Sequence, residues 1–417
     1  MQDLLYLAHR IPYPPNKGDK VRSFNEVKHL AKRYRVHLGA FIDDADDWQH
    51  RDALTQYCGE TYFASLSPAR ARLRSAKAFF TNEALTLPYY RDAGLAAWVK
   101  NILAYRPISH VVVYSSPMAQ YVRDVRQLRR IADFVDVDSD KWSQYAASKS
   151  WPWSLIYRRE AKKLAAFEQQ IAAEFDATLL VAPHEADLLR AAAPAAAQRI
   201  HHVKNGVDAH FFSPEHTFVS PYSAAEQPIV FTGAMDYWPN VDAVEWFADE
   251  VFPKVKQQRP QASFYMVGAR PAPSLQRLKG FPGVTITGSV PDVRPYIAHA
   301  RLAVAPLRIA RGVQNKVLEA MAMAKTVVVS PQAAAGIAAK AGEEYVLAAD
   351  SEEFAAAITE LLNADARHVI GKAARARVLA DYSWSANLAR LDSLLGYRAQ
   401  PEAPPPMAEA RPREVLG

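Results

Sequence analysis

The 417-residue chain contains very little cysteine and no long hydrophobic run. Its single cysteine, Cys58, excludes an intrachain disulfide framework and a zinc site built from clustered cysteines. No apolar run approaches the roughly 18–20 residues that span a bilayer, so we do not expect an integral membrane protein. The short apolar stretch at the N-terminus is not preceded by positive charge, and we therefore expect no signal peptide and a cytoplasmic location.

The chain also lacks a strong excess of one charge, because it has 50 basic and 44 acidic residues. The excess of six lies entirely in residues 1–210, which hold 29 basic and 23 acidic residues, while the rest of the chain holds 21 of each. This distribution suits an N-terminal half that meets an anionic partner, such as a membrane surface or a phosphorylated acceptor. Ordinary surface variation would give the same numbers. The basic residues form no nucleic-acid reading module, so we expect no nucleic-acid partner.

Short apolar runs alternate with helical patterns along the whole chain, which predicts βαβ units and parallel sheets. The predicted strands are 4–8, 36–42, 111–114, 134–137, 178–182, 229–232, 263–267, 284–287, 302–305 and 326–330. The predicted helices include 21–34, 155–175, 241–258, 315–324 and 352–363. Right-handed crossovers would arrange these elements as two doubly wound sheets, with ligands at the carboxyl ends of the strands.

An Asn-Gly turn at 205–206 and a Ser- and Pro-rich stretch at 211–227 predict the boundary between two domains. We expect an N-terminal Rossmann-like domain over 1–210 and a C-terminal one over 228–382. A last helix at 383–397 is expected to pack back toward the first domain. The Pro-rich stretch 401–417 is predicted to be a disordered tail.

The segment 305–324 contains the largest concentration of candidate ligand-binding residues. A strand leads into a Gly-containing loop with Arg308 and Arg311, and then into a helix that carries Lys316 and Glu319. Helix N–H groups and cations together suit a diphosphate, and a carboxylate suits a ribose diol. These residues therefore predict a nucleotide clamp. An ordinary i,i+3 ion pair on a helix surface remains open as the alternative.

At this point the sequence resembles the GT-B fold, family 4 glycosyltransferases, whose donor-site signature is similar to residues 315–322. Further matches follow in the order of that family. They lie at 12–22, 203–214, 231–240, 288–296 and 382–384. The loop 12–22, the segment 136–142 and the run 311–316 also resemble the sugar transferases associated with bacterial exosortase (PEP-CTERM) exopolysaccharide systems.

The resemblance implies an α/β, GT-B fold in which two Rossmann-like doubly wound parallel-sheet domains face a cleft. It implies that the domain over 1–210 is the acceptor side and that the domain over 228–382 binds the nucleotide sugar. It also implies retaining transfer from a UDP- or GDP-linked sugar, with no cofactor and no metal, to a glycan or lipid-linked acceptor. The implied donor-binding residues are Gly18, Gly233, Val290, Arg308, Arg311, Lys316 and Glu319.

Two departures from the family pattern bear on the donor site. The family often has two glutamates with seven residues between them, and the first of these positions is Arg311 here. The loop after the first donor-domain strand, residues 233–238, lacks the cations that the family often carries there. The cations missing from the loop 233–238 are thus replaced by basic residues in the loop that contains Arg308 and Arg311. The first glutamate of the family pair contacts the donated sugar, so its replacement by Arg311 bears on donor-sugar recognition.

We expect Arg311 and Lys316 to stabilise the leaving diphosphate, where negative charge grows in the transition state. Asp138 is the candidate to orient or deprotonate the acceptor hydroxyl. The acceptor-side candidates are His9, Lys20, Arg22, Asp136 and Asp138. For the Asp136–Asp140 cluster, a cation site of the Asp-x-Asp type and a structural helix cap stay open, and the loop before residue 22 could be a plain solvated turn.

Residues 68–90 and 141–163 combine cations with Trp, Phe and Tyr, which is typical of segments that bind anionic bilayer interfaces. We expect a peripheral contact with the cytoplasmic face of the inner membrane there, with a solvated helix face as the alternative. Two other functions also stay open. They are a GT-B-fold nucleotide-sugar epimerase and a catalytically degenerate nucleotide-sugar-binding scaffold.

Overall fold

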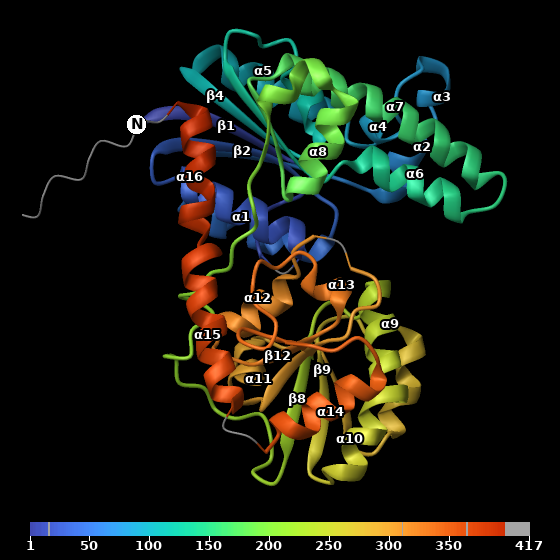
Figure 1. The fold of residues 1–417 in the computed structure, drawn as a ribbon. Helices are drawn as coiled ribbons and strands as arrows, with labels where there is room; N and C mark the ends of the chain where they lie inside the picture. The colour runs from blue at the N-terminus through green and yellow to red at the C-terminus, as the bar shows by residue number, and fades with distance from the viewer. Residues whose placement is uncertain (16, 311, 364–365, 397–417) are drawn as a thin grey trace, which may run out of the picture.

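The computed structural model describes residues 1–15, 17–310, 312–363 and 366–396, and contains two parallel sheets, each covered by helices (Figure 1). Within the described residues, the N-terminal sheet has seven strands in the order β3-β2-β1-β4-β5-β6-β7. They are β1 Gln2–Ala8, β2 Tyr34–Ile42, β3 Cys58–Ser65, β4 Ile108–Tyr114, β5 Arg129–Val135, β6 Ala177–Leu180 and β7 Ile200–His202. Each pair of neighbouring strands in this sheet is parallel, as the βαβ pattern predicts.

Helices lie on both faces of this sheet and connect its strands. They are α1 Gly18–Leu30, α2 Pro68–Ser75, α3 Ala78–Thr81, α4 Thr86–Tyr89, α5 Ala93–Tyr105, α6 Asp138–Ser148, α7 Trp153–Glu174 and α8 Pro183–Ala192, with 3₁₀ segments η1 Ala45–Leu54, η2 Ser116–Tyr121 and η3 Pro194–Arg199. The central strand β1 is buried on both faces, with Leu5 in one apolar cluster and Leu4 in the other. Its near-continuous hydrophobic run is what a central parallel strand requires.

The C-terminal sheet has six strands within the described residues, in the order β10-β9-β8-β11-β12-β13. They are β8 Gln227–Thr232, β9 Ala262–Val267, β10 Val284–Gly288, β11 Leu302–Ala305, β12 Val327–Val329 and β13 Val346–Leu347. The helical segments are α9 Trp238–Trp246, η4 Phe247–Val251, α10 Phe252–Gln258, η5 Pro273–Gly280, α11 Arg294–His299, α12 Asn315–Ala322, α13 Pro331–Ala334, α14 Ser351–Leu361 and α15 Ala366–Asp381. Strand order reverses beside β8, as it does beside β1, which places a ligand site at each reversal.

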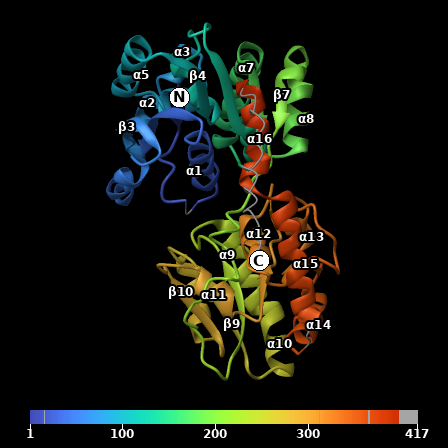
Figure 2. The same cartoon turned by 90° about the vertical axis from the view of Figure 1, so that its left-hand side faces the viewer.

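The chain crosses between the domains twice, and the two crossings pack against each other. The amide of Val207 donates to the carbonyl of Tyr382 at 2.9 Å. A Cβ added at Gly206 would lie only 2.8 Å from that same carbonyl, so only glycine fits there. After the second crossing, α16 Trp384–Leu395 returns to the N-terminal domain and buries Leu388 and Leu391 against it, whereas α15 lies along the other domain (Figure 2).

The predicted elements differ from the structure mainly at their ends. The predicted single helix 241–258 is α9, a π-helical turn η4 and α10, because Pro253 has no N–H to donate within a regular helix. The predicted helix 21–34 ends at Leu30, since Tyr34 already begins β2. Strands β3, β7 and β13 were not predicted. The predicted tail lies outside the described residues, and none of the described helices is long and apolar enough to cross a membrane.

Candidate functional site

A cavity of about 380 Å³ lies between the two domains, where the carboxyl ends of their sheets face each other. Its size is in the range of small-molecule sites. From the C-terminal domain it is lined by the loop that leads into α12, and from the N-terminal domain by residues that follow β1, β4, β5 and β6. The lining residues are His9, Gly18, Asp19, Tyr114, Ser115, Phe134, Val135, Asp136, Asp138, Lys141, Val181, Asn205, Gly312, Val313 and Asn315.

On the C-terminal side, Lys316 lies in the first turn of α12 and is held at the end of β8. Its Nζ donates to Asn240 Oδ1 at 2.6 Å and lies 4.6 Å from the centre of the Phe231 ring. Asn240 in turn donates to the carbonyl of Ala234 at 2.8 Å. A Cβ at Gly233 would approach the Asn240 amide to 2.8 Å, so this loop depends on glycine.

Burial gives Lys316 and Glu319 unusual protonation equilibria. Burial lowers the pKa of Lys316 to about 8, although the Glu319 carboxylate opposes the change. Burial raises the pKa of Glu319 to about 7, against the effect of Lys316. Among the described residues, the Glu319 carboxylate has no hydrogen-bond partner, so it is available to a diol.

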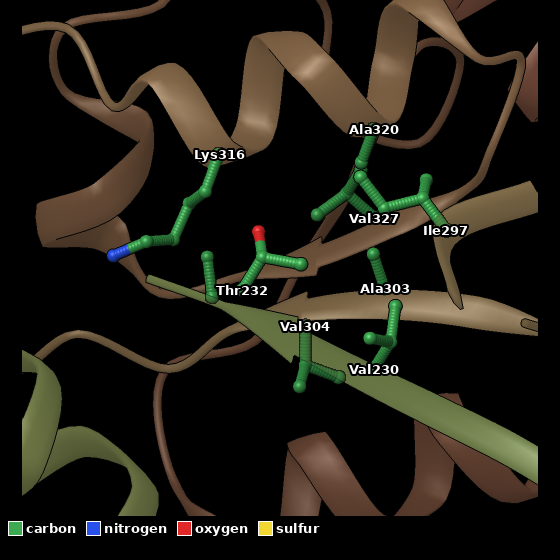
Figure 3. A pocket seen from close by; sticks show the side chains of 9 residues that line it. Val230, Thr232, Ile297, Ala303, Val304, Lys316, Ala320 and Val327 are labelled. Atoms are coloured by element: carbon green, nitrogen blue, oxygen red, sulfur yellow. The ribbon is translucent and has the colours of Figure 1, made fainter. Parts of the chain in front are cut away.

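A second, much smaller cavity of about 10 Å³ lies under α12, between Lys316, Thr232 and the apolar side chains of β8 and β11 (Figure 3). That volume is about the space of one water molecule, so it cannot hold a sugar nucleotide. Figure 3 shows Lys316 reaching past Thr232, away from the apolar residues. The candidate substrate site is therefore the larger cavity. Of the predicted donor residues that the structure describes, Gly18 lines this larger cavity and Lys316 lines the small one.

The other predicted donor residues have different positions. Arg308 is exposed and its guanidinium pairs with Asp242, with Nε at 3.0 Å from Oδ2, so its charge is already neutralised. The structure thus shows Arg308 in a surface ion pair, and its contact with the donor stays a prediction. Val290 follows the edge strand β10 and packs half-buried against the domain core. Arg311 lies outside the described residues.

On the N-terminal side, His9 follows β1 and faces Asp19 in the first turn of α1. His9 Nε2 lies 3.4 Å from Asp19 Oδ2, and the His9 ring stacks on Tyr114 at 5.8 Å. Burial alone would raise the pKa of Asp19. The opposing effects of His9 and of the Arg10 guanidinium are larger, so they hold this pKa well below its usual range. Gly18 brings α1 close to the donor domain, since a Cβ there would lie 4.0 Å from the Asn315 amide nitrogen.

The predicted Asp136 and Asp138 both line the cavity, and Lys141 joins them. Lys141 Nζ donates to Asp138 Oδ1 at 2.8 Å, and this carboxylate raises the pKa of Lys141 despite the opposing effect of burial. Burial raises the pKa of Asp136, while Lys141 opposes it. Behind them, burial raises the pKa of Glu168 to about 8, and Ser139 donates to its carboxyl group. Asp140, by contrast, accepts from Gln144 on the exposed side of α6.

Lys20 and Arg22 do not reach the cavity, which corrects their predicted contact with the acceptor. Lys20 is buried and its Nζ pairs with Asp47 Oδ2 at 2.6 Å. Arg22 is fully buried, and its Nε and Nη2 donate to Asp133 Oδ2 at 2.8 and 2.6 Å. Helix α1 points these two side chains into the domain rather than across the cleft.

Within the described part of the chain, no group of three or more His, Cys, Asp or Glu side chains could hold a metal ion. Asp19, Lys141 and Asn205 are polar cavity residues that were not predicted as site residues. Each of them stood only within a longer segment of the resemblance, at 12–22, 136–142 and 203–214.

Comparisons with known proteins agree with this geometry. Residues 226–364 match the family model described as glycosyl transferases group 1. Sucrose-phosphate synthase from Thermosynechococcus elongatus superposes with a TM-score of 0.67 at 18% identity, covering 94% of this chain and 98% of that one. The fold is GT-B. The match to the family model thus coincides with most of the second GT-B domain.

Two further GT-B structures show the same likeness. Anabaena HepE in complex with UDP has a TM-score of 0.64 at 15% identity, over 95% of this chain and all of that one. WaaG, a glycosyltransferase involved in lipopolysaccharide biosynthesis, has a TM-score of 0.63 at 15% identity, over 94% of this chain and all of that one. No curated protein matches the chain.

Proposed function

We propose that this chain is a retaining glycosyltransferase. It would move a hexose from a UDP- or GDP-linked donor to a glycan or lipid-linked acceptor in bacterial exopolysaccharide biosynthesis. One observation carries the proposal: a single cavity joins the α12 loop of the donor domain to the Asp136–Asp138–Lys141 cluster of the facing domain. The match of residues 226–364 to glycosyl transferases group 1 and the UDP in the HepE structure support it.

The donor diphosphate would lie at the N-terminus of α12, where free N–H groups and Lys316 meet it. As the glycosidic bond breaks, negative charge grows on the leaving diphosphate. Cations and N–H groups fixed in place beforehand stabilise this charge most in the transition state. Glu319 would accept hydrogen bonds from the ribose diol. Because the cation and the helix supply the positive charge, the proposal needs no metal and no cofactor.

The acceptor hydroxyl would approach from the N-terminal side. Asp138 is the candidate to orient it, and Lys141 holds that carboxylate at 2.8 Å. Asp136 and His9 line the same wall of the cavity. Carboxylates suit the hydroxyl groups of a sugar acceptor, since each oxygen accepts hydrogen bonds.

A peripheral contact with the cytoplasmic face of the inner membrane is part of the proposal. The segments 68–90 and 141–163 adjoin in the structure, where the Arg159 guanidinium donates to the carbonyl of Ala78 and lies 5.0 Å from the centre of the Phe79 ring. Large exposed apolar side chains and cations gather on these segments. They are Leu73, Phe79, Phe80, Trp151 and Trp153, with Arg70, Arg72, Lys77, Arg158 and Lys162. We call this set the aromatic–basic surface.

Helix α6 connects this surface to the cavity. It begins at Asp138, which lines the cavity, and ends at Ser148, three residues before the exposed Trp151. Eleven residues at 1.5 Å per residue make the helix about 16 Å long. An acceptor attached to a lipid could therefore reach the cavity while the aromatic–basic surface rests on the bilayer.

Calorimetric binding of UDP and GDP in EDTA tests the proposal, with native protein compared to Glu319→Ala. We expect one nucleotide to bind tightly and the substitution to weaken it. Glu343→Ala, at an exposed glutamate of the same domain, is the matched control and should change nothing. Binding that appears only after Mn²⁺ is added would contradict the metal-free clamp.

Turnover separates the alternatives. A transferase releases UDP or GDP from the nucleotide sugar, whereas an epimerase isomerises the sugar without an acceptor. A degenerate scaffold would bind the nucleotide and turn over nothing. The two last outcomes would each contradict the proposed transfer.

A further inference from the structure

Asn205 lines the interdomain cavity and is held by a fully buried guanidinium. Arg22 Nη1 donates to Asn205 Oδ1 at 2.9 Å and to the carbonyl of Val203 at 2.7 Å. A guanidinium has donors only, so the atom of the amide that faces it must be the oxygen. The orientation of the Asn205 amide is therefore fixed by chemistry, and its Nδ2 points away from Arg22.

The guanidinium that fixes this amide has no freedom to move. Its Nε and Nη2 both donate to Asp133 Oδ2, and Glu26 Oε1 lies 3.3 Å from its Nε. Glu26 is held from its other side by the Tyr6 hydroxyl, which donates to Glu26 Oε2 at 2.8 Å. All of these side chains are buried. The network thus connects α1 and β5 to the loop that carries Asn205.

The backbone of Asn205 is also fixed. Its carbonyl accepts from Asn387 Nδ2 of α16 at 3.2 Å, and the following Gly206 packs against the second domain crossing. Among the residues that the structure describes, no acceptor receives a hydrogen bond from Asn205 Nδ2. A donor that is held on several sides and left unused in a cavity is preorganised for a ligand.

The other groups of the cavity indicate what that ligand is. Asp19, Asp136 and Asp138 offer carboxylate oxygens, which accept hydrogen bonds from hydroxyl groups but repel a phosphate. A sugar has hydroxyl groups for these carboxylates and oxygen lone pairs for an amide donor. A neutral polyhydroxylated ligand therefore satisfies this wall, whereas a second anion would not.

We propose that Asn205 is a substrate-binding residue that donates a hydrogen bond to a hydroxyl or ring oxygen of the sugar in the cavity, and that Arg22 is its positioning residue. The inference rests on the proposed function and assigns to it a specific contact. It also gives Arg22, which does not reach the cavity, a role through its neighbour.

Release of UDP from UDP-glucose, or of GDP from GDP-mannose, with water as the acceptor, tests the contact. Asn205→Ala should lower kcat/KM about tenfold, the effect of one lost hydrogen bond, while the Kd for free UDP or GDP changes less than twofold. Asn205→Asp, which replaces the donor by an acceptor of the same shape, should be at least as impaired. Asn101→Ala, at an exposed asparagine of α5, is the matched control and should stay within about twofold of native.

Arg22→Lys tests the positioning. It keeps the buried positive charge but loses the forked geometry, and should lower kcat/KM in the native background and have no further effect in the Asn205→Ala background. Unchanged kcat/KM in Asn205→Ala would overturn the inference, and so would equal losses in Asn205→Ala and Asn101→Ala at equal unfolding temperatures. If Arg22→Lys does not fold, the two Asn205 variants still decide the contact. Absence of turnover in native protein would instead contradict the proposed function itself, and the inference would fall with it.

Discussion

The N-terminal domain keeps the buried cations Lys20 and Arg22 inside closed networks, whereas the C-terminal domain leaves Lys316 and Glu319 with few partners among the described residues. Arg22 donates hydrogen bonds to the Asp133 carboxylate and to the Val203 carbonyl, and Lys20 is paired with Asp47. Lys316 contacts a neutral amide, and its pKa falls to about 8 because it is buried without full compensation. The network around Arg22 is closed within the described residues, whereas the proposed function assigns a diphosphate to Lys316.

This difference predicts that the largest stability effect lies on the N-terminal side. Arg22→Met leaves Asp133 and Glu26 buried without their cation, and should lower the free energy of unfolding by about 3–5 kcal/mol. Arg277→Met, which breaks the exposed pair with Asp249, is the control and should cost at most about 1 kcal/mol. Urea denaturation measures both. Equal midpoints for the two variants would show that the buried network contributes no more than a surface pair.

The largest binding effect is expected on the C-terminal side. Lys316→Met removes a charge-assisted contact worth about 1.5–3 kcal/mol, and should weaken UDP or GDP binding about 10–100-fold. The fold should be retained, because the buried lysine contributes no ion pair to the core. Calorimetry with Lys279→Met, at an exposed lysine of the same domain, provides the comparison. Native-like affinity in Lys316→Met would place the diphosphate elsewhere.

The two domains also differ in their surfaces, since the aromatic–basic surface belongs to the N-terminal domain alone. Trp153→Ser should reduce partition into vesicles of phosphatidylglycerol and phosphatidylcholine by about fivefold to tenfold, through roughly 1–1.5 kcal/mol of lost apolar burial. Trp238 is equally exposed, at 56%, on the other domain, so Trp238→Ser is a matched control. Co-sedimentation measures the partition. Equal losses in both variants, or no binding of native protein, would contradict the membrane contact.

The smallest effect is predicted for Arg308. Its guanidinium pairs with Asp242 on the exposed side of the domain, so Arg308→Gln should change nucleotide affinity less than about threefold. Calorimetry under the conditions used for Lys316→Met gives the comparison. A loss as large as that of Lys316→Met would mean that Arg308 leaves Asp242 to meet the diphosphate.

The sequence was sufficient to predict features that depend on the order of neighbouring residues and elements along the chain. The alternation of strands and helices predicted both parallel sheets, and the positions after strands identified His9, Asp136 and Asp138, which line the cavity. It could not show which charges are already paired. Arg22 meets Asp133, which lies 111 positions away, and Arg308 meets Asp242, 66 positions away. Such pairing depends on the tertiary fold, so a free cation and a paired one look the same in the sequence.

The most direct test of the difference between the paired cations of the N-terminal domain and Lys316 of the C-terminal domain is the number of protons taken up when UDP or GDP binds. With a pKa of about 8, Lys316 is half protonated at pH 8 in the free protein. An anion beside it raises that pKa, so binding at pH 8 should take up about half a proton, and affinity should fall as pH rises above 8. Calorimetry in buffers of different ionisation enthalpy measures this uptake. About half a proton in native protein and none in Lys316→Met is the predicted result, and no uptake in native protein would contradict the account.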